Sequence, residues 1–394
     1  ARFLAGDGLD RAAFDQAIVL EQGSNEPVSD SAFAALAAML KYADQLDESR
    51  QMLESLTVHS DPGSLPFALG HLPQLHVWAG RWDDAERCAR RHLTLAEETA
   101  QESQVYAARF NLAFIAAYRG DVAAAHPSAL ALYEEGRAEG VPWTERNGAA
   151  LLGFLAMSSG DAPTAVRLFA RYDELGELMR LREPGYQRFH GDYLEALVAV
   201  GEVERAASVL ERIEPRNARL PRPSALAAAH RGRALIAAHR GDRDTAVTEA
   251  VAAVDTLRET PLVYDQARAL LTQGVIARRF KERGEARDLL SQALAHFERM
   301  GAASLSARAR REIERVGGRV AAPGAASAAL TATERSVALL AAGGHTTRQI
   351  ADSLFISGKT VEANLTRVYR KLGVSNRAQL ANSLATAEET SGLS

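Results

Sequence analysis

The chain has 394 residues, a length typical of more than one domain, and a net charge of −4. Hydrophobic residues make up 47% of it and aromatic residues only 6%, which favours close-packed helices over sheets. No run of about 18 apolar residues is present, so we expect no transmembrane helix and no membrane partner. Cys88 is the single cysteine, which excludes an internal disulfide and a cysteine-rich zinc site and is typical of the reducing cytoplasm.

The N-terminal segment, ARFLAGDGLDRAAFDQA, lacks the order of basic, apolar and small residues that marks a signal peptide. It also lacks an initial Met and has the pattern of the middle of a helical region. We therefore expect the chain to be a fragment of a longer protein.

A short motif recurs every 40 or 41 residues over much of the region 1–315. Its Gly permits a left-handed turn after one helix, its acidic residue favours the first turn of the next helix, and its Ala lets the two helices approach closely. Such hairpins bury their apolar faces by stacking, so region 1–315 is predicted to be a tetratricopeptide-like α-solenoid. The copies GRWDDA, GDVAAA, GDAPTA, GEVERA, GDRDTA and the degenerate KERGEA end at Ala85, Ala125, Ala165, Ala206, Ala246 and Ala286.

Solenoids of this kind present a concave surface, so we expect a small-molecule inducer or a protein partner to bind there. The segment HLPQLH, with His71 and His76, and the segment YEEG at 133–136 suggest metal or acid–base chemistry only weakly. Neither spacing places a ligand pair on one helical turn, so solvated or helix-end positions are the better interpretation. Trp78 and Trp82 flank the first clear turn and are predicted to pack.

Region 316–329, VGGRVAAPGAASAA, is rich in Gly, Ala, Ser and Pro and is predicted to be a flexible linker. Region 330–394 then begins a second module. Between 330 and 386 there are seven basic and three acidic residues, although the whole chain is acidic. A basic module on an acidic body indicates one end that binds a polyanion.

Capping patterns predict four short helices in region 330–394. Thr331 with Glu334, Thr346 with Gln349, and Asn376 with Gln379 have the spacing of capping boxes, and Ser357 is the expected cap of the third helix. We expect that third helix to end near Leu372, before Gly373. Its residues Val361, Leu365, Val368 and Leu372 form one apolar stripe, and the opposite side is basic and carries small residues that would allow entry into a major groove.

Residues 330–384 resemble the LuxR-type helix-turn-helix through the segments LTATERSVALLAAG, TTRQIADSLFISGKTVEANLTRVYRKLGV and NRAQLA. With the helical repeats, the chain is similar to the C-terminal part of the large ATP-binding LuxR-type regulators of the maltose-regulator class. The resemblance implies an all-α fold, a missing N-terminal ATPase, and a dimer on double-stranded DNA. Ala332 and Glu362 depart from the residues common in the family, and Glu362 leaves the base preference open.

The resemblance also implies the site residues. The base-facing positions are Glu362, Ala363, Thr366 and Arg367, and the phosphate-facing positions are Lys359, Thr360, Arg370 and Arg377. Leu380 and Leu384 of the last helix either pair two domains or pack against the third helix.

Two other interpretations compete with this one. Gly358-Lys359-Thr360 could end a nucleotide-binding loop, but the required earlier Gly is replaced by Ser353 and the segment before it is helical rather than a strand. We therefore expect neither an enzyme nor a bound cofactor in this part of the protein. The remaining alternative to a DNA-binding transcription regulator is an interaction scaffold in which the solenoid does the main work.

Overall fold

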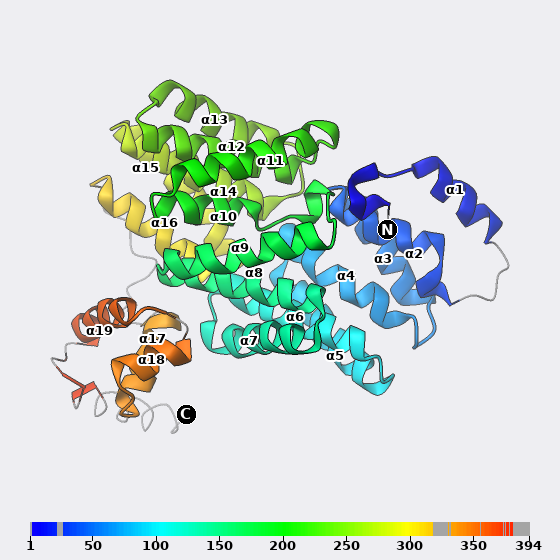
Figure 1. The fold of residues 1–394 in the computed structure, drawn as a ribbon, viewed down its shortest axis with the longest axis horizontal. Helices are drawn as coiled ribbons and strands as arrows, with labels where there is room; N and C mark the ends of the chain where they lie inside the picture. The colour runs from blue at the N-terminus through cyan, green and yellow to red at the C-terminus, as the bar shows by residue number, and fades with distance from the viewer. Residues whose placement is uncertain are drawn as a thin grey trace.

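The computed structural model describes residues 2–21, 27–317, 330, 332–354, 356–372, 374, 376, 377, 379 and 380 (Figure 1). Within these residues the regular structure is entirely helical, which confirms the all-α fold class. No helix in the described ranges is long and apolar enough to cross a membrane.

The helices fall into three groups along the chain. The N-terminal segment contains the π-helix η1 (Phe3–Asp7), α1 (Arg11–Leu20) and the 3-10 helix η2 (Val28–Asp30). The solenoid comprises α2 (Ala32–Tyr42), α3 (Leu46–His59), α4 (Leu65–Trp78), α5 (Trp82–Glu98), α6 (Glu102–Arg119), α7 (Val122–Glu139), α8 (Pro142–Ser159), α9 (Ala162–Leu178), the 3-10 helix η3 (Pro184–Tyr186), α10 (His190–Ala199), α11 (Val203–Arg219), α12 (Pro223–Arg240), α13 (Arg243–Leu257), α14 (Val263–Arg279), α15 (Arg283–Met300) and α16 (Ala303–Arg315). The C-terminal module contains α17 (Ala332–Ala342), α18 (Thr347–Leu354) and α19 (Gly358–Leu372).

The recurring motif forms the turn inside each helical hairpin, as predicted. Its glycines take left-handed backbone angles, for example φ of 82° at Gly120 and 86° at Gly160. In the degenerate copy Lys281 takes this conformation, with φ of 68°. The six alanines that end the copies have no exposed surface, because the partner helix packs directly over them: Ala85, Ala125, Ala165, Ala206, Ala246 and Ala286.

The acidic residue of the motif lies one position earlier than the sequence predicts. Asp121, Asp161 and Asp242 are N-cap residues rather than first-turn residues, and each side chain accepts a hydrogen bond from a backbone N–H at the start of the following helix. The carboxylate therefore satisfies a free helix donor as well as interacting with the helix dipole.

The first hairpin is a further copy that the sequence search missed. Between α2 and α3, Asp44 has a φ of 61° and takes the place of the turn glycine. Ser49 takes the place of the small alanine, is fully buried, and donates a hydrogen bond to the Ala37 carbonyl over 2.7 Å. Because Asp and Ser replace Gly and Ala, the letters of the motif are lost although its geometry is kept.

The solenoid curves until its early and late hairpins touch. Helix α4 contacts α14, and α6 contacts α16. The ring of Tyr118 lies 4.7 Å from that of Tyr264 and 4.6 Å from that of Phe154, measured between centroids. Arg188 pairs with both Asp44 and Asp265 in the same interior. The concave side is therefore mostly filled by the protein's own side chains.

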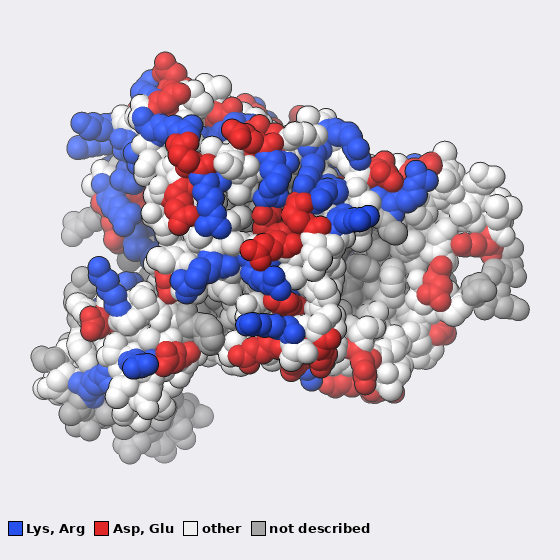
Figure 2. All heavy atoms as spheres, in the orientation of Figure 1, with Lys and Arg blue, Asp and Glu red and all other residues white. Residues whose placement is uncertain are grey.

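The surface of the solenoid is covered by charges of both signs. Figure 2 shows Lys and Arg side chains interleaved with Asp and Glu over the visible repeat helices. Several of these form ion pairs between neighbouring hairpins, such as Arg212 with Glu177 over 2.9 Å and Arg240 with Glu204 over 2.8 Å.

The C-terminal module has a hydrophobic core separate from that of the solenoid. Figure 1 shows α17, α18 and α19 as a cluster below α8, α9 and α16. Helix α17 contacts α7 of the solenoid. Most of the predicted linker, 318–329, lies outside the described residues, as does the helix predicted after Asn376 beyond residue 380.

Candidate nucleic-acid interface

Helix α19 has the two-sided character that the sequence predicts. Val361 and Val368 are completely buried and Leu365 nearly so, and Leu372 packs against the same core. Leu380 is also completely buried in this core, which confirms the packing interpretation for that residue. Leu384 lies outside the described residues.

The predicted base-facing residues lie on the outer side of α19. Glu362, Ala363 and Thr366 are exposed and Arg367 is half-buried. The Thr366 hydroxyl donates a hydrogen bond to the Glu362 carbonyl over 2.9 Å, which fixes its direction along the helix. Ala363 and Thr366 have short side chains, and Glu362 and Arg367 lie at the flanks of this outer face. The backbone of α19 can therefore come close to a bound partner.

Caps fix the start of α18 and of α19. Thr346 and Gln349 form a reciprocal capping box, with the Gln349 backbone N–H donating to the Thr346 hydroxyl over 3.2 Å and the Thr346 backbone N–H donating to the Gln349 side chain over 2.9 Å. At α19 the Ser357 hydroxyl accepts from the Thr360 backbone N–H over 3.1 Å and bonds the Thr360 hydroxyl over 2.8 Å. Thr360, which is one of the residues predicted to bind a phosphate, therefore also takes part in the cap of α19.

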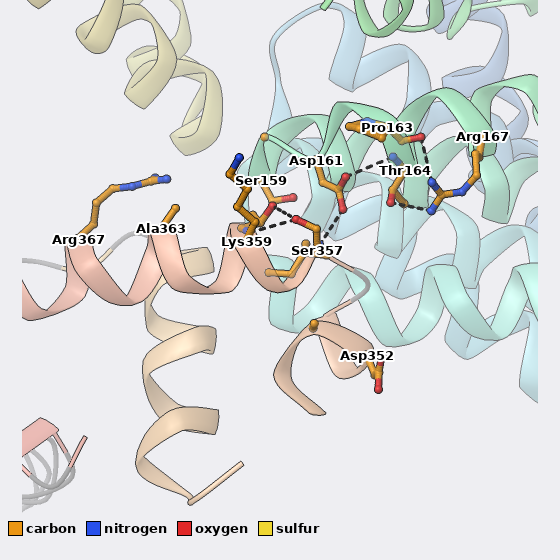
Figure 3. A pocket seen from close by; sticks show the side chains of 14 residues that line it. Ser159, Asp161, Pro163, Thr164, Arg167, Asp352, Ser357, Lys359, Ala363 and Arg367 are labelled. Carbon is orange, nitrogen blue, oxygen red and sulfur yellow. Dashed lines mark hydrogen bonds between the residues drawn. The ribbon is translucent and has the colours of Figure 1, made fainter. Parts of the chain in front are cut away.

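The start of α19 also binds the solenoid. The Ser357 backbone N–H donates to the Asp161 carboxylate over 2.9 Å, a contact drawn in Figure 3. The other oxygen of Asp161 accepts the Thr164 backbone N–H at the start of α9 over 3.3 Å. One buried carboxylate therefore caps two helices from different parts of the chain, and its negative charge is favourable at both N-termini.

A cleft of about 860 Å³ separates α19 from the turn between α8 and α9. Lys359, Thr360, Ala363 and Arg367 of α19 line it, and in Figure 3 the labelled Lys359, Ala363 and Arg367 project from one side of the helix. Four of the eight predicted site residues are thus brought together on a surface that faces the solenoid.

The cleft is lined by charges of both signs, with three basic residues and the two aspartates Asp161 and Asp352. Arg167 lines the solenoid side, where it bonds the Thr164 hydroxyl over 2.9 Å, and Lys359 and Arg367 line the opposite side. Burial lowers the pKa of Arg311 on α16, and the like charges of Arg308 and Arg367 lower it further. The solenoid therefore faces α19 with both an attractive carboxylate, Asp161, and a repulsive cluster of arginines.

Of the other two residues predicted to bind phosphates, one lies away from the cleft and the side chain of the other is not described. Arg377 donates to the His345 carbonyl and, over 3.1 Å, to the Thr347 hydroxyl, so its guanidinium lies at the start of α18. Arg370 is on α19, but its side chain is outside the described part of the structure.

Comparison with known families matches residues 328–384 to the bacterial regulatory proteins of the luxR family. The C-terminal module is a LuxR-type helix-turn-helix domain. Helices α17, α18 and α19 all lie within the matched residues.

Similar proteins include provisionally named HTH-type transcriptional regulators of Mycobacterium bovis and of Mycobacterium tuberculosis strain H37Rv. Each is 46% identical over 56 residues, which cover 14% of this chain and 6% of the relative. The aligned part is thus a small fraction of those proteins.

Two solved structures are similar in overall shape. A Rap protein complexed with competence and sporulation factor has a TM-score of 0.48 and 11% identity, over 79% of this chain and 93% of that one. A STAND signal-transduction ATPase with a tetratricopeptide repeat sensor from Pyrococcus horikoshii has a TM-score of 0.43 and 13% identity, over 96% of this chain and 52% of that one.

Other sequence candidates lie in the solenoid. His76 lies in the last turn of α4, in agreement with the helix-end interpretation, but it is buried rather than solvated, and burial lowers its pKa to about 4. His71 is partly buried and bonds the Lys41 ammonium over 3.0 Å. Among the described residues no group of three His, Cys, Asp or Glu side chains is arranged to bind a metal ion. Trp78 and Trp82 are buried, and the Trp82 indole donates to the Val77 carbonyl over 3.0 Å.

Sequence reasoning missed Asp161 as part of the interface. In the sequence it is one of several equivalent aspartates of the repeat, and nothing in its neighbours distinguishes it. Only the contact with Ser357, 196 residues away, does so.

Proposed function

We propose that the protein is a DNA-binding transcription regulator in which the solenoid controls the helix-turn-helix domain. The observation that supports it best is the placement of α19. Its outer face has the small and basic residues of a recognition helix, and that same face is turned toward the solenoid. A DNA-binding surface that faces another part of the same chain can be controlled by that part.

The roles proposed for α19 follow from its chemistry. Glu362, Ala363, Thr366 and Arg367 face the bases, where short side chains allow close approach and polar groups bond base edges. Lys359, Thr360, Arg370 and Arg377 bind phosphates, which supply salt-dependent affinity and position the helix in the groove. A second copy bound to a neighbouring half-site completes the proposed DNA complex.

The control we propose is competition for the N-terminus of α19. Helix N-termini bind phosphates through free backbone N–H groups and the helix dipole. The Asp161 carboxylate occupies this position through its bond to the Ser357 N–H. DNA binding therefore requires that Asp161 leave, and the two arrangements are alternative states of one molecule.

DNA binding is tested by reversing the basic face. The triple variant Lys359→Glu, Arg367→Glu, Arg370→Glu is compared with the unaltered chain by fluorescence anisotropy on sequences selected from random DNA. We expect at least a hundredfold loss of affinity and a shallower dependence on salt, because three positive charges are reversed and two of them are proposed to neutralise phosphates. A matched variant, Arg279→Glu, Arg283→Glu, Arg287→Glu, alters three exposed arginines of the solenoid and should leave both quantities unchanged.

Unchanged affinity and salt dependence in the α19 triple variant would contradict the regulator function. The interaction-scaffold function would then replace it, with the helix-turn-helix domain as an auxiliary part.

We also propose that the full protein belongs to the large ATP-binding LuxR-type class. The order of a helical-repeat region followed by a LuxR-type domain supports this assignment. Saturable binding of a fluorescent ATP analogue to the full-length gene product would be the expected result, and the absence of such binding would contradict it.

A further inference from the structure

The interior of the solenoid contains a cavity of about 410 Å³, within the size range of small-molecule sites. A smaller cavity of about 50 Å³ adjoins it, because the two share five wall residues. We call them the outer and the inner chamber. The shared residues are Tyr42, Gln74, Phe110, Trp143 and Tyr186.

The outer chamber is built to hold a flat apolar body. Aromatic rings of α4, α6 and α8 face it, including Phe67, Phe110 and Trp143. A few polar groups interrupt this wall and are held in fixed directions: the Gln74 amide donates to Asn111 over 3.1 Å, and the Asn111 amide donates to the Gly70 carbonyl over 2.9 Å. An apolar wall with a few fixed polar groups is typical of a ligand site.

The inner chamber ends at a buried guanidinium with unfilled bonding capacity. Arg146 is 2% exposed, stacks on the Tyr172 ring at 3.8 Å, and donates to the Gln187 side chain. Its Nε is buried and has no hydrogen-bond partner among the described residues. No described carboxylate forms an ion pair with Arg146, in contrast to Arg188 in the same wall, which pairs with Asp44 and Asp265.

A second buried basic group lies behind the outer chamber. Lys41 has no exposed surface, and its ammonium lies 3.0 Å from both His71 Nδ1 and the Gln74 side-chain oxygen, two wall residues. Within the described ranges it has no carboxylate partner, and burial lowers its pKa well below the usual value. Neither chamber has an Asp or Glu in its wall.

Burying a charge without a counter-ion is costly, so the unpaired guanidinium of Arg146 at the end of the inner chamber indicates a counter-ion that comes from outside. We propose that the cavity binds a small organic anion, with a flat apolar or aromatic body in the outer chamber and a carboxylate bonded to Arg146. The ligand's negative charge then neutralises the inner wall as Asp44 and Asp265 neutralise Arg188.

This ligand is the effector of the regulator. Its role as effector rests on the proposed function, but its binding to the cavity does not. Helix α8 connects the two sites. Trp143 and Arg146 lie in its first turns, and Asp161 lies two residues beyond its last residue, Ser159. An 18-residue helix spans about 27 Å as one rigid element, so a ligand that shifts its start also shifts the carboxylate that holds α19.

Binding is tested by calorimetry with 1-naphthoate and its neutral amide, 1-naphthamide, which has nearly the same shape. We expect saturable binding of one naphthoate per chain, at least tenfold tighter than that of naphthamide, because a charge-assisted bond to Arg146 is lost in the amide. Arg146→Met should remove this preference. Arg109→Met, on the outer side of α6, is the matched control and should keep it.

Ala107 lines the outer chamber without touching Arg146, so Ala107→Phe fills the cavity and should weaken both probes at least tenfold. This second variant serves if Arg146→Met does not fold. Equal affinity for the acid and the amide, unchanged binding in Ala107→Phe, or no saturable binding of naphthoate at about 1 mM would overturn the proposal.

The same titrations in the presence of selected DNA separate the two proposals. Naphthoate binding by a chain that does not bind DNA would leave the anion site standing and contradict the regulator. DNA binding by a chain that does not bind naphthoate would leave the regulator standing and contradict the anion site.

Discussion

Lys281 takes a left-handed backbone conformation at a turn where five other copies of the motif have glycine. A residue with a Cβ is strained there, so Lys281→Gly should stabilise the protein by about 1 kcal/mol in denaturant unfolding. Gly241→Ala is the converse control at the equivalent turn, where an added Cβ meets no atom within 4 Å, and should destabilise by a similar amount. Destabilisation by Lys281→Gly would contradict the assigned register of the last repeat.

Two buried histidines make the stability of the solenoid depend on pH. Burial lowers the pKa of His76 and of His92 from 6.5 to about 4, so the unfolded chain binds more protons between these values. Their contribution is therefore fully present above pH 6.5 and is lost as the pH falls toward 4. We expect a loss of about 2 kcal/mol per histidine between pH 7.5 and 5, measured by urea unfolding.

His76→Gln should make this pH dependence less steep, whereas His239→Gln, at an exposed position, should leave it unchanged. A slope that is the same in His76→Gln and in the unaltered chain would show that His76 is not protonated on unfolding.

Individual residues were predictable where a local pattern determines them. The stripe of Val361, Leu365 and Val368 follows from helical periodicity, and the caps at Thr346 and Ser357 follow from the residue types. The added role of Asp161 was not predictable, because it depends on packing between distant parts of the chain.

Each hairpin element depends on the small residue where its two helices cross. Ala206 has no exposed surface, so Ala206→Trp should force α10 and α11 apart and destabilise the protein by about 3 kcal/mol. Ser208→Trp, two residues later on the exposed side of α11, should have little effect. Equal melting temperatures for the two variants would contradict the placement of the helix crossing at Ala206.

Hairpin elements were predictable when the motif kept its residue types. The six copies with a recognisable motif, including the degenerate one, were found at their turns, because the left-handed position and the close helix crossing each restrict the amino acid. The first hairpin was missed because Asp44 and Ser49 meet the same requirements with other residues.

The arrangement of the whole molecule was only partly predictable. Repeats indicate a solenoid, but they do not indicate that α4 meets α14 and α6 meets α16. Those contacts depend on the sum of small rotations between hairpins, to which every interface contributes. The cavity and the contact between Asp161 and the start of α19 likewise depend on packing between distant parts of the chain, so neither was visible in the sequence.

The central claim is that the solenoid holds the start of the recognition helix through Asp161. Asp161→Asn tests it, because asparagine keeps the cap of α9 but removes the charge that competes with a DNA phosphate. Asp242→Asn, in the equivalent cap of α13, is the control. The affinity of the full chain for its selected DNA, measured by fluorescence anisotropy, should rise about tenfold in Asp161→Asn and stay constant in Asp242→Asn. Unchanged or weaker DNA binding by Asp161→Asn would contradict the claim.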